Sequence, residues 1–309
     1  MGYRKLVDKS FKPHRVKALE PYIEELVNML IDRFIERGEC EFVSQFAIPL
    51  PLYVIADTIG ISRDKAADFK RWSDALMKVH EPGISAELQI ELTKVVIEMQ
   101  RFFAAEYEKA LPNPKENILG DLATSQIDGR PVTPQEVVAL LSSILVAGNE
   151  STASALGNCM RRIIQTPGIL ATLQGDSSKI SAFVEEVLRL DAPLQCQYRR
   201  AVKEVELSGQ KVPANSMLVL RYGAGNRDES RFPNASQIDL ERPQVRNHLT
   251  FGRGIHSCLG MQLARAELNV AMRILVTRMT NFRSTAEPEV LPSYMVYGPS
   301  KLPIAFDRR

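Results

Sequence analysis

One long helical pattern runs through the middle of this 309-residue chain, from Thr133 to about Gln165. Thr133, Pro134 and Glu136 mark its start, because a capping threonine, a first-turn proline and a capping-box acid stand at the spacing that opens a helix. At a rise of about 1.5 Å per residue, this helix would be roughly 50 Å long. A helix of that length crosses a whole domain, so we expect the other elements to pack around it.

Helical patterns also dominate the rest of the chain. The periodicity of apolar residues predicts helices at residues 21–38, 62–79, 86–111, 178–190 and 259–279. One hairpin is predicted, with strands at 197–207 and 211–220 around a Ser208-Gly209 turn. A β-rich tail follows the last helix, and loops are expected at 112–116, 126–130 and 226–247. The pattern predicts a mainly α fold with small β-sheets, in a single domain that spans residues 1–309.

Charge and cysteine content argue against several classes of protein. The 39 Lys and Arg residues nearly balance the 37 Asp and Glu residues, so no global basic field would attract nucleic acid. The cysteines lack a CxxC pair, which argues against a disulfide framework or a four-thiolate zinc site and favours a reducing cytoplasm. The longest uncharged apolar run, residues 137–149, is shorter than the roughly 20 residues of a membrane span. We therefore expect a cytoplasmic protein with neither nucleic acid nor membrane as a partner.

The stretch FGRGIHSCLG, residues 251–260, places one cysteine between a glycine-rich loop and the start of a helix. The dipole and free amides of a helix N-terminus favour the thiolate form of Cys258. Gly252, Gly254 and Gly260 let the backbone approach a flat, bulky group closely, and nearby amides can donate hydrogen bonds to the sulfur. A GxGxxG nucleotide loop does not fit, because a serine replaces the third glycine, and a zinc site lacks suitably spaced partners. These features are typical of a haem thiolate ligand.

The stretch resembles the FxxGxHxCxG haem-binding signature of the cytochrome P450 family, and CLGMQLARAEL resembles the soluble bacterial members of that family. The resemblance implies a P450-like fold with haem b as its cofactor. It also implies that Cys258 is the axial iron ligand, whose thiolate favours cleavage of the O–O bond. His256 then corresponds to a partner of a haem propionate, and Phe251, Gly252 and Gly260 surround the haem.

A second match lies on the long helix, where Ala147-Gly148-Asn149-Glu150-Ser151-Thr152 resembles the oxygen-binding groove of the family. An acid in a buried helix costs free energy unless it has a partner or a function. The resemblance implies that Ala147 and Gly148 lie against the haem, and that Glu150 and the following hydroxyl deliver protons during oxygen activation. The family usually has threonine at the position of Ser151, and Thr152 is the alternative hydroxyl.

A third match is Glu186-Val187-Leu188-Arg189, which resembles the ExxR motif of the family. By itself, an acid and an arginine three residues apart form a surface pair worth a few tenths of a kcal/mol. In the family the pair is buried with an arginine from a later loop, which corresponds to Arg242 in IDLERP. The resemblance therefore implies a structural network that fixes the loop carrying the cysteine.

Two more arginines correspond to the family's haem propionate ligands. Arg199 in QYRRA is one, with Arg200 as its competitor, and Arg4 in YRKLVDKSF is the other. The latter stretch resembles the family's C helix, entered one turn late, so the histidine of its HxxxR pattern has no counterpart. The first quarter of the family's soluble members, which includes a substrate-capping helix, also has no counterpart. Either the numbering covers part of a longer protein or the chain is shortened.

The resemblance implies a monooxygenase that uses dioxygen and electrons relayed from NAD(P)H by a separate ferredoxin- or flavodoxin-type partner. A basic run in residues 1–17 would suit the docking of such an acidic partner. The substrate is expected to be a small apolar molecule, and its contacts are expected at Val146, Leu194, Met295 and Val296. Two alternatives stay open: a peroxide-driven haem enzyme, and a truncated non-catalytic or haem-free homologue.

Overall fold

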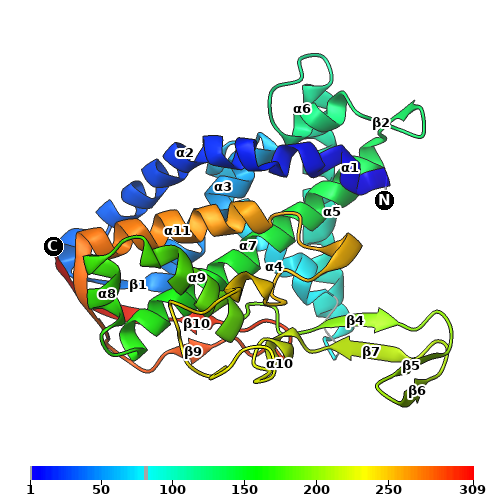
Figure 1. The fold of residues 1–309 in the computed structure, drawn as a ribbon. Helices are drawn as coiled ribbons and strands as arrows, with labels where there is room; N and C mark the ends of the chain where they lie inside the picture. Colours follow the sequence, from blue (N-terminus) through cyan, green and yellow to red (C-terminus); the bar gives the residue numbers. More distant parts are fainter. Residues whose placement is uncertain (1, 80–82) are drawn as a thin grey trace.

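The computed structural model describes residues 2–79 and 83–309, which form a body made mostly of helices (Figure 1). Its central helix is α7, Pro134–Gln165, so the predicted start and end are confirmed. The predicted capping box is also present, and the backbone N–H of Thr133 donates to the Glu136 carboxylate at 2.8 Å. The helices that pack against α7 include α3 (Pro49–Ile59), α5 (Ala86–Ala110) and α11 (Met261–Arg278).

The remaining helices are shorter and surround this centre. Apart from their end residues, the helices predicted at 62–79, 86–111, 178–190 and 259–279 are confirmed. The α-helices not yet given are α1 (Gly2–Asp8), α2 (Pro13–Asp32), α4 (Ala66–Lys78), α6 (Ile118–Ala123), α8 (Ile169–Gly175), α9 (Lys179–Leu190) and α10 (Tyr222–Gly225). Short turns of other helix types lie at Lys9–Phe11, Ile35–Arg37, Val43–Ala47, Arg63–Lys65, Val245–Asn247 and Gly254–His256.

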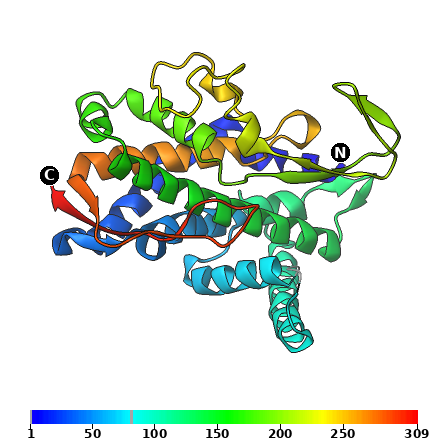
Figure 2. The same ribbon diagram turned by 90° about the horizontal axis from the view of Figure 1, so that it is seen from below.

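Helix α2 lies beside α11 (Figures 1 and 2), and its bounds differ from the prediction of residues 21–38. The helix begins at Pro13 and continues through Pro21, so the predicted start was wrong. A proline inside a helix leaves the carbonyl of the residue four positions earlier without its N–H partner. Pro21 and Lys17 are both exposed, so water can replace the lost hydrogen bond.

Small antiparallel sheets join the ends of the chain. Strand β11 (Pro303–Arg308) lies between β1 (Glu39–Glu41) and β8 (Met279–Ser284). Strand β9 (Glu289–Val290) pairs with β10 (Pro299–Lys301). The β-rich tail predicted after the last helix is therefore confirmed, and one of its strands pairs with a segment from the first fifty residues.

The predicted hairpin at 197–220 is confirmed, but its ladder is interrupted. Strand β4 (Gln197–Arg200) pairs with β7 (Met217–Leu220), and β5 (Val205–Leu207) pairs with β6 (Gln210–Val212). Pro213 follows β6, and proline cannot donate a ladder hydrogen bond, which accounts for the break on that side. The hairpin extends away from the helical body in both ribbon views (Figures 1 and 2).

A second hairpin was missed at residues 126–130, which we predicted to be a loop. Strands β2 (Gln126–Ile127) and β3 (Arg130–Pro131) pair around Asp128 and Gly129. Both turn residues have positive φ, 50° and 78°. An Asp-Gly pair favours this two-residue turn, so the signal was present in the sequence.

The two halves of α7 differ in their surroundings. From Thr152 to Met160 every residue is buried, whereas Ala147 is exposed and Val146 and Gly148 are half-buried. By length and composition α7 could cross a bilayer. The buried core helix of a globular protein, however, can have the same length and composition. Because other helices pack around it, we interpret α7 as a core helix with one open face near Ala147.

Candidate active site

The loop of residues 251–260 is shaped by its glycines and by backbone hydrogen bonds. Gly252 and Gly254 have φ of 64° and 73°, in the left-handed region that favours glycine. The Cys258 amide donates to the Phe251 carbonyl oxygen at 2.8 Å. The Cys258 side chain is exposed, and a Cβ added at Gly260 would meet open space. The loop thus presents a thiol on an open surface directly before α11.

The protein alone does not favour the thiolate form of Cys258. Partial desolvation by the surrounding protein raises the pKa of the thiol, although the Gly260 amide and the charges of Arg4 and Arg265 act in the opposite direction. The amide at the start of the helix thus favours the thiolate, as predicted, but desolvation outweighs it in the chain by itself. A bound cation would add the positive charge that favours the thiolate.

Arg4 on α1 contacts the cysteine loop. Its Nη1 donates to the Ser257 carbonyl oxygen at 2.7 Å, and its Nε lies 3.5 Å from the Asp8 carboxylate. Arg4 is half-buried. Its hydrogen bond joins the first helix to Ser257, the residue that precedes Cys258.

A buried ion-pair network that the sequence analysis missed supports the other side of the loop. The Glu185 carboxylate lies 3.0 Å from His248 Nε2 and accepts from Arg265 at 2.5 and 2.9 Å. Burial would raise the pKa of Glu185, but its contacts with His248 and Arg265 outweigh burial and lower that pKa to about 2. The Arg265 guanidinium stacks 4.6 Å from the centre of the Phe251 ring. The network therefore holds the residue whose carbonyl accepts from the Cys258 amide.

Glu186, Arg189 and Arg242 lie in direct contact. The Glu186 carboxylate accepts from Arg189 at 2.7 and 3.0 Å and from Arg242 at 2.9 Å. Arg189 is fully buried, at 0% exposure. It also donates to the carbonyl oxygens of Asn226, Ala235 and Gln237. The cluster thereby organises the irregular segment 226–242, which was predicted to be a loop.

The open face of α7 carries Ala147, Glu150 and Ser151. The Ser151 hydroxyl donates to the Ala147 carbonyl oxygen at 2.8 Å, and a Cβ added at Gly148 would lie 3.3 Å from Ile55 on α3. Thr152 is only 4% exposed and lies on the buried side of α7. One residue turns a helix by about 100°, so Thr152 lies on a different side of α7 from Ser151. The burial of Thr152 therefore favours Ser151 as the hydroxyl of the relay.

Glu150 has a basic neighbour that the sequence analysis missed. Its carboxylate lies 4.0 Å from Lys70 Nζ on α4, and Lys70 also contacts Asp74. Burial raises the pKa of Glu150, while Lys70 lowers it and Asp74 raises it. Lys70 and Glu150 are 80 positions apart, so only the packing of α4 against α7 brings them together.

We expect Lys70→Met to raise the pKa of Glu150 further, because the substitution removes the charge that opposes burial. A larger fraction of Glu150 would then be protonated at any given pH. Infrared titration of the carboxyl band, assigned with Glu150→Gln, measures this shift. Lys70→Arg should keep the pKa near that of the unmodified chain. An equal shift in Lys65→Met, which removes a lysine paired with Asp68, would contradict a specific role for Lys70.

Of the remaining predicted residues, the propionate partners are exposed, whereas the predicted substrate contacts lie close together. Arg199 and Arg200 are both exposed on β4, where successive side chains point to opposite faces, and His256 is exposed at the end of its short helix. The predicted substrate contacts Leu194 and Val296 form a β-bridge. The adjacent residues are hydrogen bonded too: the Gln195 amide donates to the carbonyl oxygen of Met295, another predicted substrate contact, at 2.7 Å.

The residues present fit a haem. Cys258, Ala147, Arg199 and His256 are all exposed, which leaves a thiol, an apolar helix face and two basic side chains open to a large ligand. A haem presents an iron, an apolar ring and two carboxylates, which match these three kinds of group. Within the described residues no group of three or more His, Cys, Asp or Glu side chains could hold a metal ion.

Comparison with known proteins gives consistent matches. A family model described as Cytochrome P450 matches residues 85–295. Cytochrome P450 107B1 of Saccharopolyspora erythraea is 32% identical over 305 residues, which cover 97% of this chain and 73% of the relative. A steroid C26-monooxygenase of Mycobacterium tuberculosis is 33% identical over 307 residues, covering 98% and 77% of the two chains. The solved structure of CYP109Q5 from Chondromyces apiculatus has a TM-score of 0.90 at 34% identity, covering 99% of this chain and 76% of that one.

Proposed function

Because the chain belongs to the cytochrome P450 family of monooxygenases, we propose that it inserts one atom of dioxygen into a small apolar organic substrate. Haem b is the proposed cofactor, held in a single domain that spans residues 1–309. Electrons come from NAD(P)H through a reductase and a separate ferredoxin- or flavodoxin-type partner. The observation that carries this proposal is the exposed Cys258 thiol on a loop whose backbone is fixed from both sides.

A bound haem would supply the activation of dioxygen, using electrons delivered by the redox partner. The chain would hold the haem iron through Cys258, and Arg4, Arg199 and His256 would pair with the propionates. Phe251, Gly252 and Gly260 would shape the loop that meets the haem, and Ala147 and Gly148 would form the facing surface of α7. Val146, Leu194, Met295 and Val296 are proposed to contact the substrate, which suits an apolar molecule. The steroid named for one relative is of this class.

The proposed proton relay consists of Glu150 and Ser151. The raised pKa of Glu150 lets it hold a proton closer to neutral pH than an ordinary carboxyl. The hydrogen bond of Ser151 to the Ala147 carbonyl keeps its hydroxyl on the open face of α7. Glu150 therefore exchanges protons with solvent near Lys70, and Ser151 passes them toward the open face.

We expect Ser151→Ala to lower the yield of product per NAD(P)H consumed by about tenfold or more, because proton transfer by a positioned group contributes roughly 10²–10⁴-fold. Product and NAD(P)H are measured in the same reaction. Ser143→Ala is a matched control, since the Ser143 hydroxyl donates to the carbonyl four residues earlier on the same helix, at 2.9 Å. Equal yields for both variants and the unmodified chain would exclude Ser151 from the relay.

The electron donor is proposed to be acidic and to dock near the start of the chain. Some of the basic residues in the run 1–17 are engaged within the protein: Arg4 with Asp8, and Lys9 and Arg15 with Asp121. Lys5, Lys12 and Lys17 are exposed and supply the docking charge. We propose a cytoplasmic location, because all four cysteines are free thiols, as in a reducing compartment.

The proposed function is tested with the haem-loaded chain, a ferredoxin, its reductase, NADPH and a set of apolar compounds. With ¹⁸O₂ as the oxygen source, we expect a product that carries one ¹⁸O atom. Turnover with peroxide but not with the electron-transfer proteins would favour a peroxide-driven enzyme. Failure of the chain to retain haem would favour the non-catalytic homologue.

A further inference from the structure

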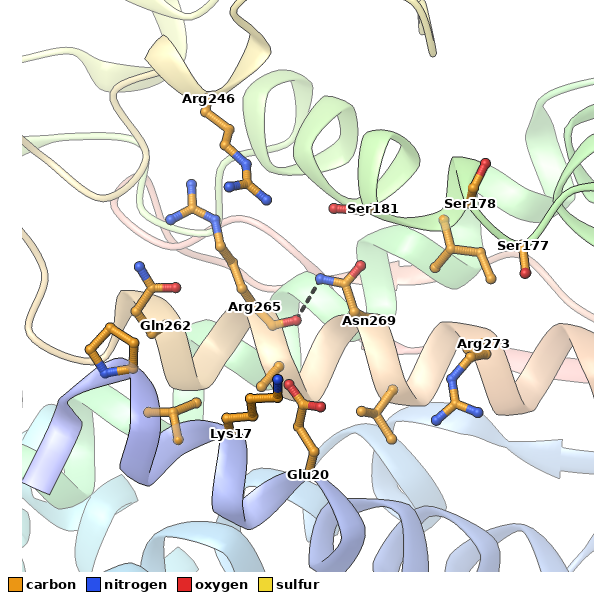
Figure 3. Close-up of a pocket in the computed structure, with 15 residues that line it drawn as sticks. Lys17, Glu20, Ser177, Ser178, Ser181, Arg246, Gln262, Arg265, Asn269 and Arg273 are labelled. Carbon is orange, nitrogen blue, oxygen red and sulfur yellow. Dashed lines mark hydrogen bonds between the residues drawn. The ribbon is translucent and has the colours of Figure 1, made fainter.

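An open cavity of about 580 Å³ lies between α2, α9 and α11, on a wall formed by none of the residues assigned above to haem or substrate (Figure 3). Four basic side chains line it, and one carboxylate does: Lys17, Arg246, Arg265, Arg273 and Glu20. Small-molecule sites occupy roughly 300–1,000 Å³. The cavity therefore has the size of a ligand site. Arg273 is paired with Glu24 at 3.1 Å and Arg265 with Glu185 at 2.5 Å, so its available positive charge comes mainly from Lys17 and Arg246.

Arg246 and Arg265 lie beside one another at one end of the cavity in Figure 3. Both guanidinium groups approach the same Glu185 oxygen, Arg265 at 2.5 Å and Arg246 at 3.8 Å. Arg265 is hydrogen bonded to that carboxylate, whereas the side chain of Arg246 is 67% exposed. One carboxylate cannot neutralise two guanidinium groups, so Arg246 keeps N–H donors available for an anion.

The start of α9 forms the facing wall and adds donors suited to phosphate. Ser177, Ser178 and Ser181 line the cavity there. The first amides of the 12-residue helix α9 are already engaged: the Ser178 amide donates to the Asp176 carboxylate at 2.9 Å, and the Lys179 and Ile180 amides donate to the carbonyl oxygens of Asp176 and Ser177. The serine hydroxyls are therefore the groups that this end of the helix can offer. Asp176 accepts from Ser178 at 2.6 Å and reduces the charge at that corner. Hydroxyls and a guanidinium fork are both groups that bind phosphate oxygens.

We propose that this cavity binds the phosphate group of a small phosphorylated molecule. Arg246 is its principal ligand, Ser181 is the serine drawn nearest to it in Figure 3, and Lys17 lies on the wall formed by α2. The concave shape favours a small ligand over the surface of an acidic protein. Arg246 and Ser181 have no role in the proposed monooxygenase function. Lys17 is shared with the proposed docking charge for the electron donor, so the test substitutes Arg246 rather than Lys17.

The proposed site is nevertheless close to the cysteine loop. Arg265 lines the cavity and stacks on Phe251, whose carbonyl accepts from the Cys258 amide at 2.8 Å. The cavity is therefore linked to the backbone of Cys258 by two contacts in series, Arg265 with the Phe251 ring and the Phe251 carbonyl with the Cys258 amide. An anion beside Arg265 would therefore alter the electrostatic environment of the thiol.

The test is calorimetric titration with inorganic phosphate, at constant ionic strength set with sodium chloride, on the haem-loaded and the haem-free chain. We expect saturable binding with one site per chain in both forms. Arg246→Gln should weaken it about tenfold, since charge-assisted hydrogen bonds to phosphate are among the stronger ones. Arg101→Gln removes the same charge from an exposed position on α5 and should leave binding unchanged.

Three results would overturn the proposal. The first is binding that does not saturate, and the second is an equal loss in Arg101→Gln, which would indicate general charge attraction. The third is no phosphate binding together with binding of an acidic ferredoxin that Arg246→Gln weakens, which would identify a protein docking surface. Because the haem-free chain is also titrated, failure to bind haem leaves this test intact.

Discussion

Replacing Cys258 with serine is expected to abolish the strongly red-shifted Soret band of the reduced carbon monoxide complex, and monooxygenase turnover with it. A serine hydroxyl is far less acidic than a thiol and is a poor ligand for iron, so the electron donation that favours O–O cleavage is lost. Absorption spectra of the purified, reduced protein before and after addition of carbon monoxide measure the effect. Persistence of the red-shifted band in this variant would overturn the assignment of Cys258 as the ligand.

The control for this substitution is Cys40→Ser. Cys40 lies on β1, opposite Ile304, and is buried, at 7% exposure. Burial raises the pKa of its thiol to about 12, so it is not a candidate ligand, and its replacement should leave the band unchanged. Cys258 is exposed, so Cys258→Ser should change the free energy of unfolding of the haem-free chain by no more than about 0.5 kcal/mol. Loss of the red-shifted band with no change in the free energy of unfolding would then show that Cys258→Ser removes the iron ligand and does not unfold the protein.

The sequence predicted most reliably those structural features that depend on interactions between residues close together in the chain. The capping box at Thr133 and Glu136 fixed the start of α7, and the stretch 251–260 predicted the family, which the comparisons confirm. The Asp128-Gly129 hairpin was equally local, and its turn signal was overlooked.

The sequence could not predict what depends on rotation about a helix axis or on packing between distant segments. Glu185 and Glu186 are adjacent and both buried, yet one contacts Arg265 and the other Arg189 and Arg242. Periodicity does not specify which acid faces which arginine. The choice between Ser151 and Thr152 likewise depended on which side of α7 is open, and the pKa of Cys258 depended on how much protein surrounds it.

The network around Glu186 should be the most sensitive of these contacts to mutation. We expect Glu186→Gln to lower the free energy of unfolding by about 3–5 kcal/mol, because it leaves two buried guanidinium groups without their counter-charge. Arg189 and Arg242 are 0% and 7% exposed, so water cannot compensate for the loss. Urea unfolding of the haem-free chain measures the change. The control Glu241→Gln removes an exposed partner of Lys179 and should cost less than about 1 kcal/mol.

Glu186→Gln should also increase the flexibility of one segment, residues 226–242. The second Glu186 oxygen accepts from the Asp239 amide at 2.8 Å, and Arg189 holds the carbonyls of Asn226, Ala235 and Gln237. Once the carboxylate is gone, both arginines can reorient and release this backbone, so amide hydrogen exchange should rise across residues 226–242 before it rises in α7. Uniform exchange across the whole chain would mean that Glu186 stabilises the fold as a unit. If this segment opens first, Glu186 acts mainly on residues 226–242, whose Asn226 side chain accepts from the Leu249 amide at 2.6 Å just before the cysteine loop.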